Sequence, residues 1–488
     1  MSSFTGAFID NTWSGGDGLE SISVINPCTG EECGKVSACG AAQADAALAA
    51  AQAAAPGWGK LSIDARAALL EGWKAQLLAH KDEIVALLVA ETGKVAGNAG
   101  YDFSMLVDCI GFHVQEVRRA YGTVFPSPDD SALSYTRATP VGVTVMVLTW
   151  NFPLLNLGYK LGPALATGCT AVVKPSELTP LATSRCLELL AAVDVDGGGG
   201  GGGFPAGVVN VVNGTGLALV EPLCASKVPR LLACIGSSEM GRRMVGYSAA
   251  TTVKRFALEL GGDAPVLVFA DADLDAAVAD IVGLKFANGG QICVSPNRVF
   301  VHASIYEAFL AKAVEKAAAY AFGSGDDHAP KEEVLQPVAT EESLRRLLAL
   351  VEDATAKGAR VLHGGGRVDR AGFFMEPTVL ADATDAMACQ AAEIFGPILA
   401  CRSFGSDDEV FAAANDSEWG LSGYVYTRSL STALRAEQEL MCGNVCVNGA
   451  HYSIELPHGG LKQSGYGKDI SHLALRDYYD IRRITIKR

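Results

Sequence analysis

The sequence predicts an α/β fold, because short apolar runs of strand length alternate with segments of helical pattern. Residues 141–148 form a continuous apolar run, as in a parallel strand that is buried on both faces. A helix to about residue 167 and a second apolar run at 170–173 complete a β-α-β unit. Polar residues follow both runs, at the strand ends where open α/β sheets bind ligands. The alternation resumes after residue 259, so we expect two α/β halves.

Composition limits the classes of protein. The chain has 488 residues, enough for two or three domains, with 49% hydrophobic and 19% charged residues. A net charge of −15 argues against a nucleic-acid or anionic-membrane partner. No apolar run reaches the roughly 20 residues of a membrane span, and no secretory signal is evident, so we expect a cytoplasmic protein. The 13 cysteines lack zinc-site spacing, which predicts reduced thiols and no metal.

Short strands and turns are expected in residues 1–40, and three helices after them, at 41–55, 64–92 and 99–121. Pro56 is expected to end the first helix, and Asp64 to cap the second. Seven consecutive glycines at 197–203 predict a flexible surface loop without assigned function.

The remaining pattern continues the alternation. Further strands are expected at 207–212, 231–235, 253–259, 267–269 and 299–302, and helices at 273–286, 305–321 and 341–357. The last stretch, 478–488, alternates as an edge strand does.

One cysteine stands in an unusual setting. Cys293 follows the pair Gly289-Gly290 and lies between Ile292 and Val294. The glycines allow the backbone to approach a ligand closely, which suits a thiolate nucleophile on a tight turn. Taken alone, a cysteine between apolar residues is more often buried and inert, so the hypothesis needs partners from other segments.

Candidate partners follow the predicted strands. Asn151 comes after the run 141–148, and Lys174 and Glu177 follow the next strand. A surface ion pair is the alternative interpretation of Lys174 and Glu177. Gly236 and Ser237 precede a helix, where free N–H groups and the helix dipole favour a phosphate. Together these residues predict a ligand cleft.

The residue types fit oxidation of a carbonyl compound. A thiolate of Cys293 adds to a carbonyl carbon, and the Asn151 amide and the Cys293 N–H stabilise the oxyanion, at about 3–4 kcal/mol for each donor. The adduct then loses a hydride to a nicotinamide held at the strand ends and becomes a thioester. A carboxylate such as Glu259 activates the water that releases the acid. No metal is required.

Six motifs carry a family resemblance. They occur in family order and are Trp150-Asn151-Phe152-Pro153, Lys174-Pro175-Ser176-Glu177, Gly236-Ser237-Ser238-Glu239-Met240-Gly241, Glu259-Leu260-Gly261-Gly262, Gly290-Gln291-Ile292-Cys293 and Glu393-Ile394-Phe395-Gly396-Pro397. Over essentially its whole length the sequence resembles the aldehyde dehydrogenase superfamily. By that resemblance Cys293 is the nucleophile, Asn151 the oxyanion donor and Glu259 the general base.

The resemblance implies NAD as cofactor, with NADP as an alternative. Lys174 and Glu177 would hold the adenosine ribose, Ser237 the pyrophosphate and Glu393 the nicotinamide ribose, with Phe395 near the ring. A carboxylate at Glu177 would repel a 2′-phosphate, which favours NAD. The full set expected at the cofactor is Thr149, Trp150, Lys174, Ser176, Glu177, Gly214, Gly236, Ser237, Leu260, Glu393 and Phe395.

The resemblance also implies three parts and a homodimer or homotetramer. The expected parts are a Rossmann-like dinucleotide-binding domain (1–121 and 141–258), an α/β catalytic domain (259–450) and a small β oligomerisation arm (122–140 and 470–488).

The expected substrate is a small-molecule aldehyde, either an uncharged aliphatic or aromatic one or an amino aldehyde. Mouth residues are expected to be Phe152, Asn156, Tyr159, Ile292 and Val294, which are mostly apolar or aromatic. Segment 457–469 is similar to that of aminobutyraldehyde dehydrogenases. Tyr159 could face a cationic amine, with Asp102 or Asp108 adding charge, although a solvated helix face is the alternative interpretation of both aspartates.

Three alternatives stay open. Family members that oxidise succinate semialdehyde carry arginines at two positions that are Tyr159 and Ala287 here. The missing charges weaken that alternative, because a buried carboxylate without a partner costs several kcal/mol. The second alternative is a CoA-acylating enzyme, but such relatives lack a base, and Glu259 is present here. The third alternative is a binding protein without turnover, which would have lost a catalytic residue.

Overall fold

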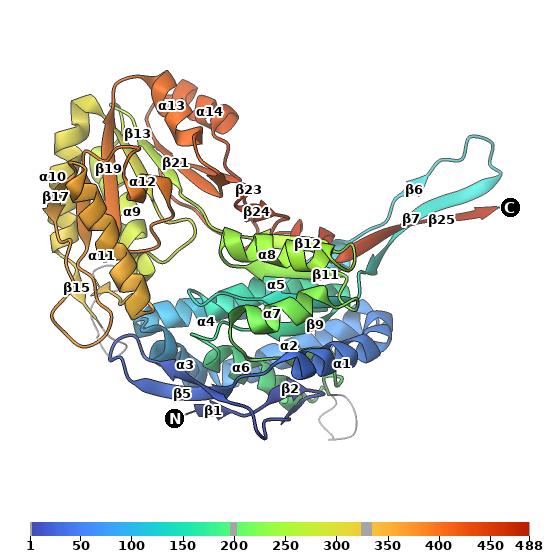
Figure 1. Ribbon diagram of the computed structural model, residues 1–488. Coiled ribbons are helices and arrows are strands. Elements are labelled where there is room, and N and C mark those ends of the chain that lie inside the picture. Colours follow the sequence, from blue (N-terminus) through green and yellow to red (C-terminus); the bar gives the residue numbers. More distant parts are fainter. Residues whose placement is uncertain (1, 196–202, 324–333, 488) are drawn as a thin grey trace.

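The computed structural model describes residues 2–195, 203–323 and 334–487. Two large sheets with helices on both faces form the body of the molecule, and a β arm projects from it (Figure 1). The expected α/β fold class is therefore confirmed. The division into three domains at the stated boundaries stays a prediction.

The first sheet has eight strands in the order β24-β12-β11-β8-β9-β10-β2-β3. Its central strands pair in parallel, and β24, β2 and β3 pair antiparallel at the edges. Their bounds are β2 Ala7–Ile9, β3 Thr12–Ser14, β8 Val143–Val147, β9 Thr170–Lys174, β10 Val209–Val211, β11 Leu231–Ile235, β12 Arg255–Glu259 and β24 Gly465–Tyr466.

The apolar run in β8 is buried on both faces because its side chains alternate between two cores. Val143, Val145 and Val147 pack with one set of helices, and Met146 packs with the other. The helices of this half are α1 Ala41–Lys60, α2 Ile63–Ala79, α3 Lys81–Thr92, α4 Ala96–Glu116, α5 Pro153–Thr167, α6 Leu181–Glu188, α7 Gly216–Ala225 and α8 Ser238–Ala249.

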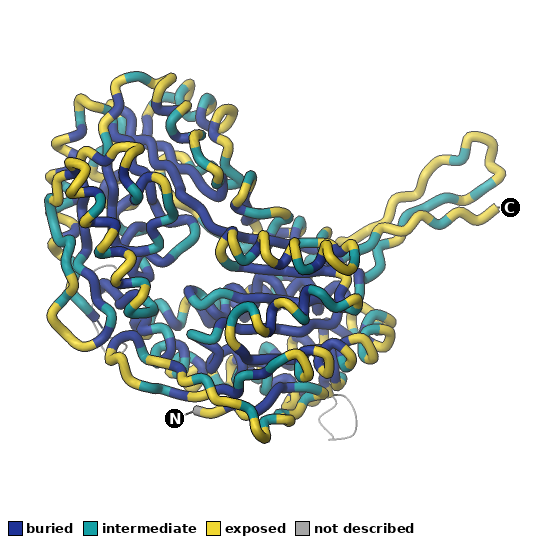
Figure 2. Tube along the Cα trace, in the orientation of Figure 1, coloured by how far each residue is buried: buried dark blue, intermediate teal, exposed yellow. Residues whose placement is uncertain are grey.

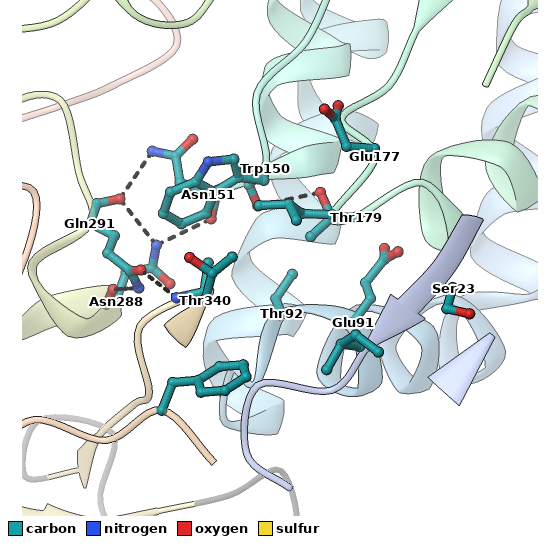
Figure 3. A pocket seen from close by; sticks show the side chains of 14 residues that line it. Ser23, Glu91, Thr92, Trp150, Asn151, Glu177, Thr179, Asn288, Gln291 and Thr340 are labelled. Atoms are coloured by element: carbon teal, nitrogen blue, oxygen red, sulfur yellow. Dashed lines mark hydrogen bonds between the residues drawn. The ribbon is translucent and has the colours of Figure 1, made fainter. Parts of the chain in front are cut away.

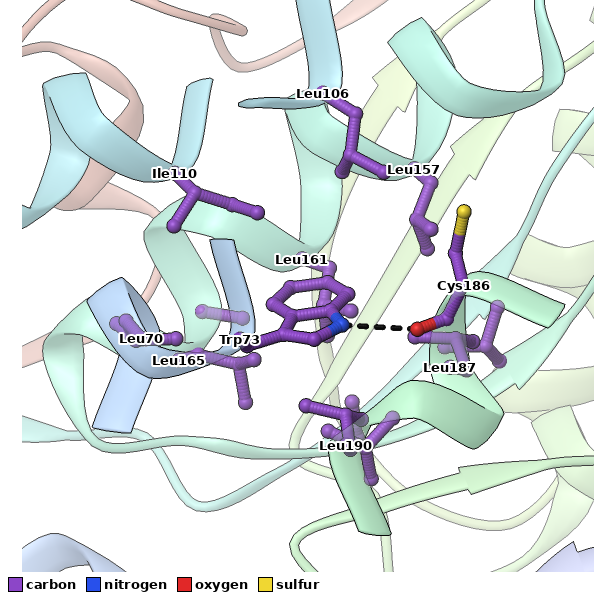
Figure 4. Close-up of a cluster of buried hydrophobic side chains, with 14 of the residues drawn as sticks. Leu70, Trp73, Leu106, Ile110, Leu157, Leu161, Leu165, Cys186, Leu187 and Leu190 are labelled. Atoms are coloured by element: carbon purple, nitrogen blue, oxygen red, sulfur yellow. Dashed lines mark hydrogen bonds between the residues drawn. The ribbon is translucent and has the colours of Figure 1, made fainter. Parts of the chain in front are cut away.

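One core of this half is centred on Trp73, which is fully buried between α2, α4, α5 and α6 (Figure 4). Its indole N–H donates to the Cys186 carbonyl at 2.8 Å, so the one polar atom of the ring is satisfied. Leucines of α4 and α5, such as Leu106 and Leu161, surround the ring. This packing fixes α5, which begins at Pro153, two residues after Asn151.

Two helix predictions differ from the structure. The first helix does not end at Pro56 but continues to Lys60, because Trp58 beyond the proline is buried against Phe204, with ring centroids 5.1 Å apart. The long helix 64–92 is two helices, α2 and α3, that meet at His80. Ser62, rather than Asp64, caps α2 by accepting a bond from the Ala65 N–H at 3.1 Å.

The second sheet has seven strands in the order β17-β18-β19-β14-β13-β21-β22. Their bounds are β13 Pro265–Val268, β14 Arg298–His302, β17 Arg360–His363, β18 Thr378–Ala381, β19 Ile398–Phe404, β21 Ser422–Tyr426 and β22 Asn444–Val447. The helices of this half are α9 Leu274–Phe286, α10 Tyr306–Ala318, α11 Glu341–Ala356, α12 Ala388–Ala391, α13 Asp407–Asn415 and α14 Leu430–Glu439.

The arm consists of three antiparallel strands in the order β25-β7-β6, with bounds β6 Val124–Phe125, β7 Ala132–Pro140 and β25 Tyr479–Lys487. β25 pairs with β7 over nine residues, so the chain end returns to a segment more than 300 residues earlier. Much of the arm is exposed (Figure 2), including Val124 at 70% and Ile481 at 67%.

Short strands complete the fold: β1 Ser2–Phe4, β4 Ser21–Ile25 and β5 Glu32–Ser37 form one sheet, and β15 Ala321–Phe322 with β16 Val334–Leu335 and β20 Trp419–Gly420 with β23 Leu461–Lys462 form two pairs. No disulfide bond joins cysteines within the described part of the chain. The predicted glycine loop at 197–203 lies, except for Gly203, outside the described residues. Among the described residues, no helix has the length and apolar character to cross a membrane.

Candidate active site

A cleft of about 510 Å³ lies at the carboxyl ends of four neighbouring strands, β9, β8, β11 and β12. This is the edge at which parallel sheets place ligands, and the volume is that of a small-molecule site. The cleft brings together nearly all the residues predicted at the cofactor, along with all three of the predicted catalytic residues. The residues from the prediction that line it are Thr149, Trp150, Asn151, Lys174, Ser176, Glu177, Gly236, Ser237, Glu259, Leu260, Cys293, Glu393 and Phe395.

At one end of the cleft Glu177 is held by two donors. Lys174 Nζ lies 3.2 Å from one carboxylate oxygen, and the Gly216 N–H donates to the other at 3.1 Å. Burial works against its charge, but Lys174 and the neighbouring N–H groups keep the pKa of Glu177 below its ordinary value. The Lys174–Glu177 pair is therefore a fixed feature of the cleft wall, not a solvated surface ion pair.

Ser237 caps α8, and its hydroxyl accepts a bond from the Met240 N–H at 3.1 Å. The start of this helix faces the same cleft, which places its free N–H groups and positive dipole end where an anionic group can bind.

Gly214, one of the predicted cofactor residues, is placed differently. It is buried against Cys39 and Leu219, and Gly216 takes its place on the cleft wall. Gly214 is therefore not among the residues that line the cleft.

Glu393 and Phe395 close the other end of the cleft. Glu393 accepts a bond from the Gly262 N–H at 3.1 Å, yet burial raises the pKa of this carboxyl to about 7. Phe395 contacts the Trp150 ring edge-on, with centroids 5.4 Å apart. Its φ of +48° is strained for an aromatic residue, and such strain concentrates at ligand-binding sites.

Cys293 lies at the seam between the two sheets, after a turn that requires glycine. Asn288, Gly289 and Gly290 all have left-handed φ values of 51°, 64° and 75°. A Cβ on Gly290 would come within 2.2 Å of the Gly396 carbonyl oxygen, so only glycine fits there. The predicted turn thus packs against the motif that carries Phe395.

The Cys293 thiol is half-buried, and its protonated form is favoured. Burial raises its pKa well above the ordinary value, and the charge of Glu259 nearby adds to the effect. The Cys293, Glu259 and His458 side chains meet here, and their sulfur, oxygen and nitrogen atoms lie within 4.8 Å of one another. The carboxylate is therefore close enough to receive the proton of the thiol.

Asn151 is held beside this turn by a small amide network (Figure 3). Its Nδ2 donates to the Gln291 carbonyl at 3.0 Å, and Asn288 Nδ2 donates to the Asn151 carbonyl at 3.1 Å. Asn156 donates to Asn151 Oδ1 at 3.3 Å. A side-chain amide has two N–H donors, so one remains for a ligand.

Several residues predicted at the aldehyde mouth have other positions. Asn156 is 4% exposed and supports Asn151 instead of lining the mouth. Val294 is also buried, and its carbonyl accepts a bond from the Tyr424 hydroxyl at 2.7 Å. Ile292 and Phe152 are half-buried, and Phe152 lies 4.0 Å beneath the Lys94 ammonium.

The two aspartates considered for a cationic substrate have different environments. Asp102 is fully buried, forms an ion pair with Lys94 at 2.6 Å and accepts a bond from the Leu155 N–H at 2.7 Å. This buried pair supports the start of α5 and is not a solvated helix face. Asp108, in contrast, is exposed.

The sequence did not assign a role to His458, which the structure places in the site. Its Nε2 is 3.5 Å from Glu259, and its ring lies 6.1 Å from Tyr159 and 6.0 Å from Tyr452. In the sequence, the only indication of a role for His458 was its position in a glycine-rich loop. Tyr159, one of the residues predicted at the aldehyde mouth, forms an aromatic wall with Tyr452 and His458; its role at the aldehyde stays a prediction.

A buried ion pair lies behind this wall. Lys160 Nζ is 2.7 Å from Asp469 and also donates to the Ala257 carbonyl at 3.1 Å. Both side chains are at most 4% exposed. The pair ties α5 to the C-terminal loop that carries His458.

Comparison with known proteins identifies the family. The model of the aldehyde dehydrogenase family matches residues 13–484, and the chain belongs to this family. The chain is an NAD(P)-dependent aldehyde oxidoreductase, and the activity predicted from the sequence is confirmed.

Individual relatives match over nearly the full length. The chain is 36% identical to the 3-sulfolactaldehyde dehydrogenase of Pseudomonas putida, over 98% of this chain and 96% of the relative. It is 35% identical to the NADP(+) succinate-semialdehyde dehydrogenase of Escherichia coli, over 98% and 97%. The solved indole-3-acetaldehyde dehydrogenase of P. syringae, in complex with NAD+, superimposes with a TM-score of 0.93 at 30% identity, over 99% and 96% of the two chains.

Proposed function

We propose that Cys293 is the nucleophile, Glu259 the general base and Asn151 the oxyanion donor of this aldehyde dehydrogenase. The observation that carries the proposal is the meeting of Cys293 and Glu259 at the inner end of the cleft whose outer end holds Lys174 and Glu177. A small molecule bound to the nucleophile and a dinucleotide in the cleft would therefore share one reaction centre.

The chain's own residues account for each proton. Glu259 takes the proton of the Cys293 thiol, and the thiolate adds to the aldehyde carbon. The Asn151 amide, held by Asn156 and Asn288, donates its free N–H to the resulting oxyanion. When bound, the nicotinamide supplies the acceptor for the hydride that leaves this carbon. Glu259 releases the thiol proton to solvent through the cleft, which returns it to the carboxylate form. It then deprotonates the water that hydrolyses the thioester on Cys293.

We infer that NAD is preferred over NADP. The Glu177 carboxylate is ionised, its pKa being below the ordinary value, so it accepts bonds from ribose hydroxyls and repels a 2′-phosphate. Lys174 is already bonded to Glu177 and to the Pro175 carbonyl, which leaves little of its charge for a phosphate. The E. coli relative named for NADP(+) is the reason to test both cofactors.

For the substrate we propose an uncharged aliphatic or aromatic aldehyde, or an amino aldehyde. The wall beside Cys293 offers the rings of Tyr159, Tyr452 and His458, and the buried cation behind this wall, Lys160, is paired with Asp469. A carboxylate on the substrate would find carboxylates and rings there, at a cost of several kcal/mol.

A semialdehyde is the second candidate, and the names of the two curated relatives favour it. A semialdehyde with an acidic tail would need a cation outside this wall, since neither Tyr159 nor Ala287 supplies one.

The finer expectations on assembly also remain proposals. The exposed apolar residues of the arm, such as Ile481 and Val124, support a homodimer or homotetramer in which these strands are covered. A cytoplasmic location is proposed from the sequence alone.

The test is an aldehyde panel followed as NADH or NADPH formation at 340 nm. Neutral, cationic and anionic aldehydes of equal length would be compared with NAD and NADP in parallel. We expect the highest kcat/KM for NAD with a neutral or cationic aldehyde. A preference of tenfold or more for the anionic aldehyde would instead establish the semialdehyde candidate.

A variant tests the nucleophile. Cys293→Ser should lower kcat by about 10⁴-fold or more while NADH binding stays within twofold. Cys401→Ser, at a fully buried cysteine in β19, is the matched control. Near-normal turnover of Cys293→Ser would end the proposal.

A further inference from the structure

Glu259, Cys293 and His458 form a compact three-ligand cluster from three distant segments: the end of β12, the glycine turn and the C-terminal loop. Their ligand atoms all lie within 4.8 Å of one another, and His458 Nε2 is 3.5 Å from Glu259 Oε1. A tetrahedral zinc ion with bonds of about 2.0–2.3 Å holds its ligands roughly 3.4–3.8 Å apart. The side chains would need to close by only about 1 Å.

One oxygen of the cluster has no satisfactory partner. Glu259 is 3% exposed, and no described residue makes a hydrogen bond of good geometry with its Oε1. A buried polar atom left in this state costs free energy. A cation placed between the carboxylate, the sulfur and the imidazole would satisfy it.

Backbone hydrogen bonds fix the position of His458, the proposed nitrogen ligand. Its N–H donates to the Asp469 carbonyl at 2.9 Å, and the Asp469 N–H donates back at 2.7 Å. Gly460, two residues later, is so close to Ser464 that an added Cβ would lie 2.3 Å from that side chain. The backbone that carries this ligand is therefore fixed before any ion arrives, which lowers the entropic cost of binding.

The ligand types select the kind of ion. A sulfur, an imidazole nitrogen and one carboxylate suit Zn²⁺ and similar thiophilic divalent ions, whereas Mg²⁺ and Ca²⁺ prefer oxygen ligands. Three protein ligands leave a fourth position for water, which the adjoining cleft can supply.

We propose that these three residues form a reversible inhibitory site for Zn²⁺ or a similar thiophilic divalent cation. Coordination releases the thiol proton to solvent and occupies the sulfur lone pair that would attack the aldehyde. Inhibition rests on the proposed role of Cys293, but binding of the ion does not. No metal is needed for the oxidation itself; the ion blocks it.

The direct test is a Co²⁺ titration of the full-length enzyme, without cofactor, aldehyde or thiol reductant. We expect one Co²⁺ per chain with a thiolate-to-cobalt charge-transfer band and the intense visible bands of tetrahedral cobalt, both displaced by Zn²⁺. Cys293→Ala should abolish the charge-transfer band. A band that persists in Cys293→Ala would assign the ion to another of the 13 cysteines and overturn the proposal.

His458 supplies the discriminating variant. His458→Phe should weaken Zn²⁺ binding at least about 100-fold, since even residues behind metal ligands contribute about 10–100-fold to affinity. His451→Phe, at an exposed position of the same loop, should leave the affinity unchanged. His458→Gln, checked by thermal melting, serves if the phenylalanine variant fails to fold. Equal Zn²⁺ affinity in the wild type and either folded His458 variant would refute the site.

The functional arm of the test follows NADH formation. Zn²⁺ should inhibit the wild type and EDTA should restore full activity. Tight binding in the Co²⁺ titration without inhibition would contradict the role assigned to Cys293 while leaving the metal site intact, so the two proposals fail separately.

Discussion

The two sides of Cys293 are built by different means. On the cofactor side, charged and polar side chains follow the ends of neighbouring strands, as Lys174 and Glu177 do after β9. On the aldehyde side, rings from α5 and the C-terminal loop form a wall around Tyr159 and His458. In the proposed function, the first side recognises its ligand by charge and hydrogen bonds, and the second by shape and ring contacts. The predictions below use this contrast.

The largest effect is expected at the boundary of the two sides. Glu259→Gln removes the proton acceptor, and general bases contribute about 10²–10⁴-fold to turnover. Because Glu259 takes the thiol proton and later that of the water, stopped-flow measurement should show a burst of NADH that is slower than in the wild type, followed by slow steady-state turnover. A lost burst with normal cofactor binding would assign Glu259 to activation of Cys293 alone.

On the cofactor side, Glu177→Gln should raise the KM for NAD about 10–100-fold, because bonds to a charged group contribute about 1.5–3 kcal/mol. The KM for NADP should fall or stay constant, since the repelling charge is gone. Glu188→Gln, in an ion pair with Arg185 away from the cleft, should change neither value. An equal rise for both cofactors would indicate a structural defect at Glu177.

A pH effect should also appear on the cofactor side. Burial raises the pKa of Glu393 to about 7, and only its ionised form accepts bonds from both ribose hydroxyls. NAD affinity should therefore be full above pH 8 and fall about tenfold by pH 6 as the carboxylate takes up a proton. NADH fluorescence titrations of wild type and Glu393→Gln would measure this; a variant with the same pH profile as the wild type would exclude Glu393.

The smallest effect is expected on the aldehyde side. Tyr159→Leu should raise the KM of a cationic aldehyde about 2–5-fold relative to a neutral one of equal length, because a cation over an aromatic ring gains at least about 0.5–1 kcal/mol. Tyr159→Phe keeps the ring and should behave as the wild type. Equal changes for both aldehydes would show that Tyr159 contributes shape without selecting charge.

The sequence predicted correctly those features that depend on residues close together in the chain. The strand at 231–235 and the turn around Gly290 were expected where they occur, because strand ends and glycine turns are set by neighbours in the chain. Helix ends were less predictable: burial of Trp58 carries α1 past Pro56. Asp102 was misjudged because its partner, Lys94, approaches from the segment between two helices.

The sequence by itself determined the α/β class, the family and the residues at the strand ends, because each of these depends on patterns only a few residues long. Tertiary structure alone decided that His458 meets Glu259 and Cys293, that Asn156 supports Asn151 and that Lys160 is paired with Asp469. These contacts join residues up to 309 positions apart. Their distances depend on how two sheets and a returning loop pack, and no local pattern encodes that packing.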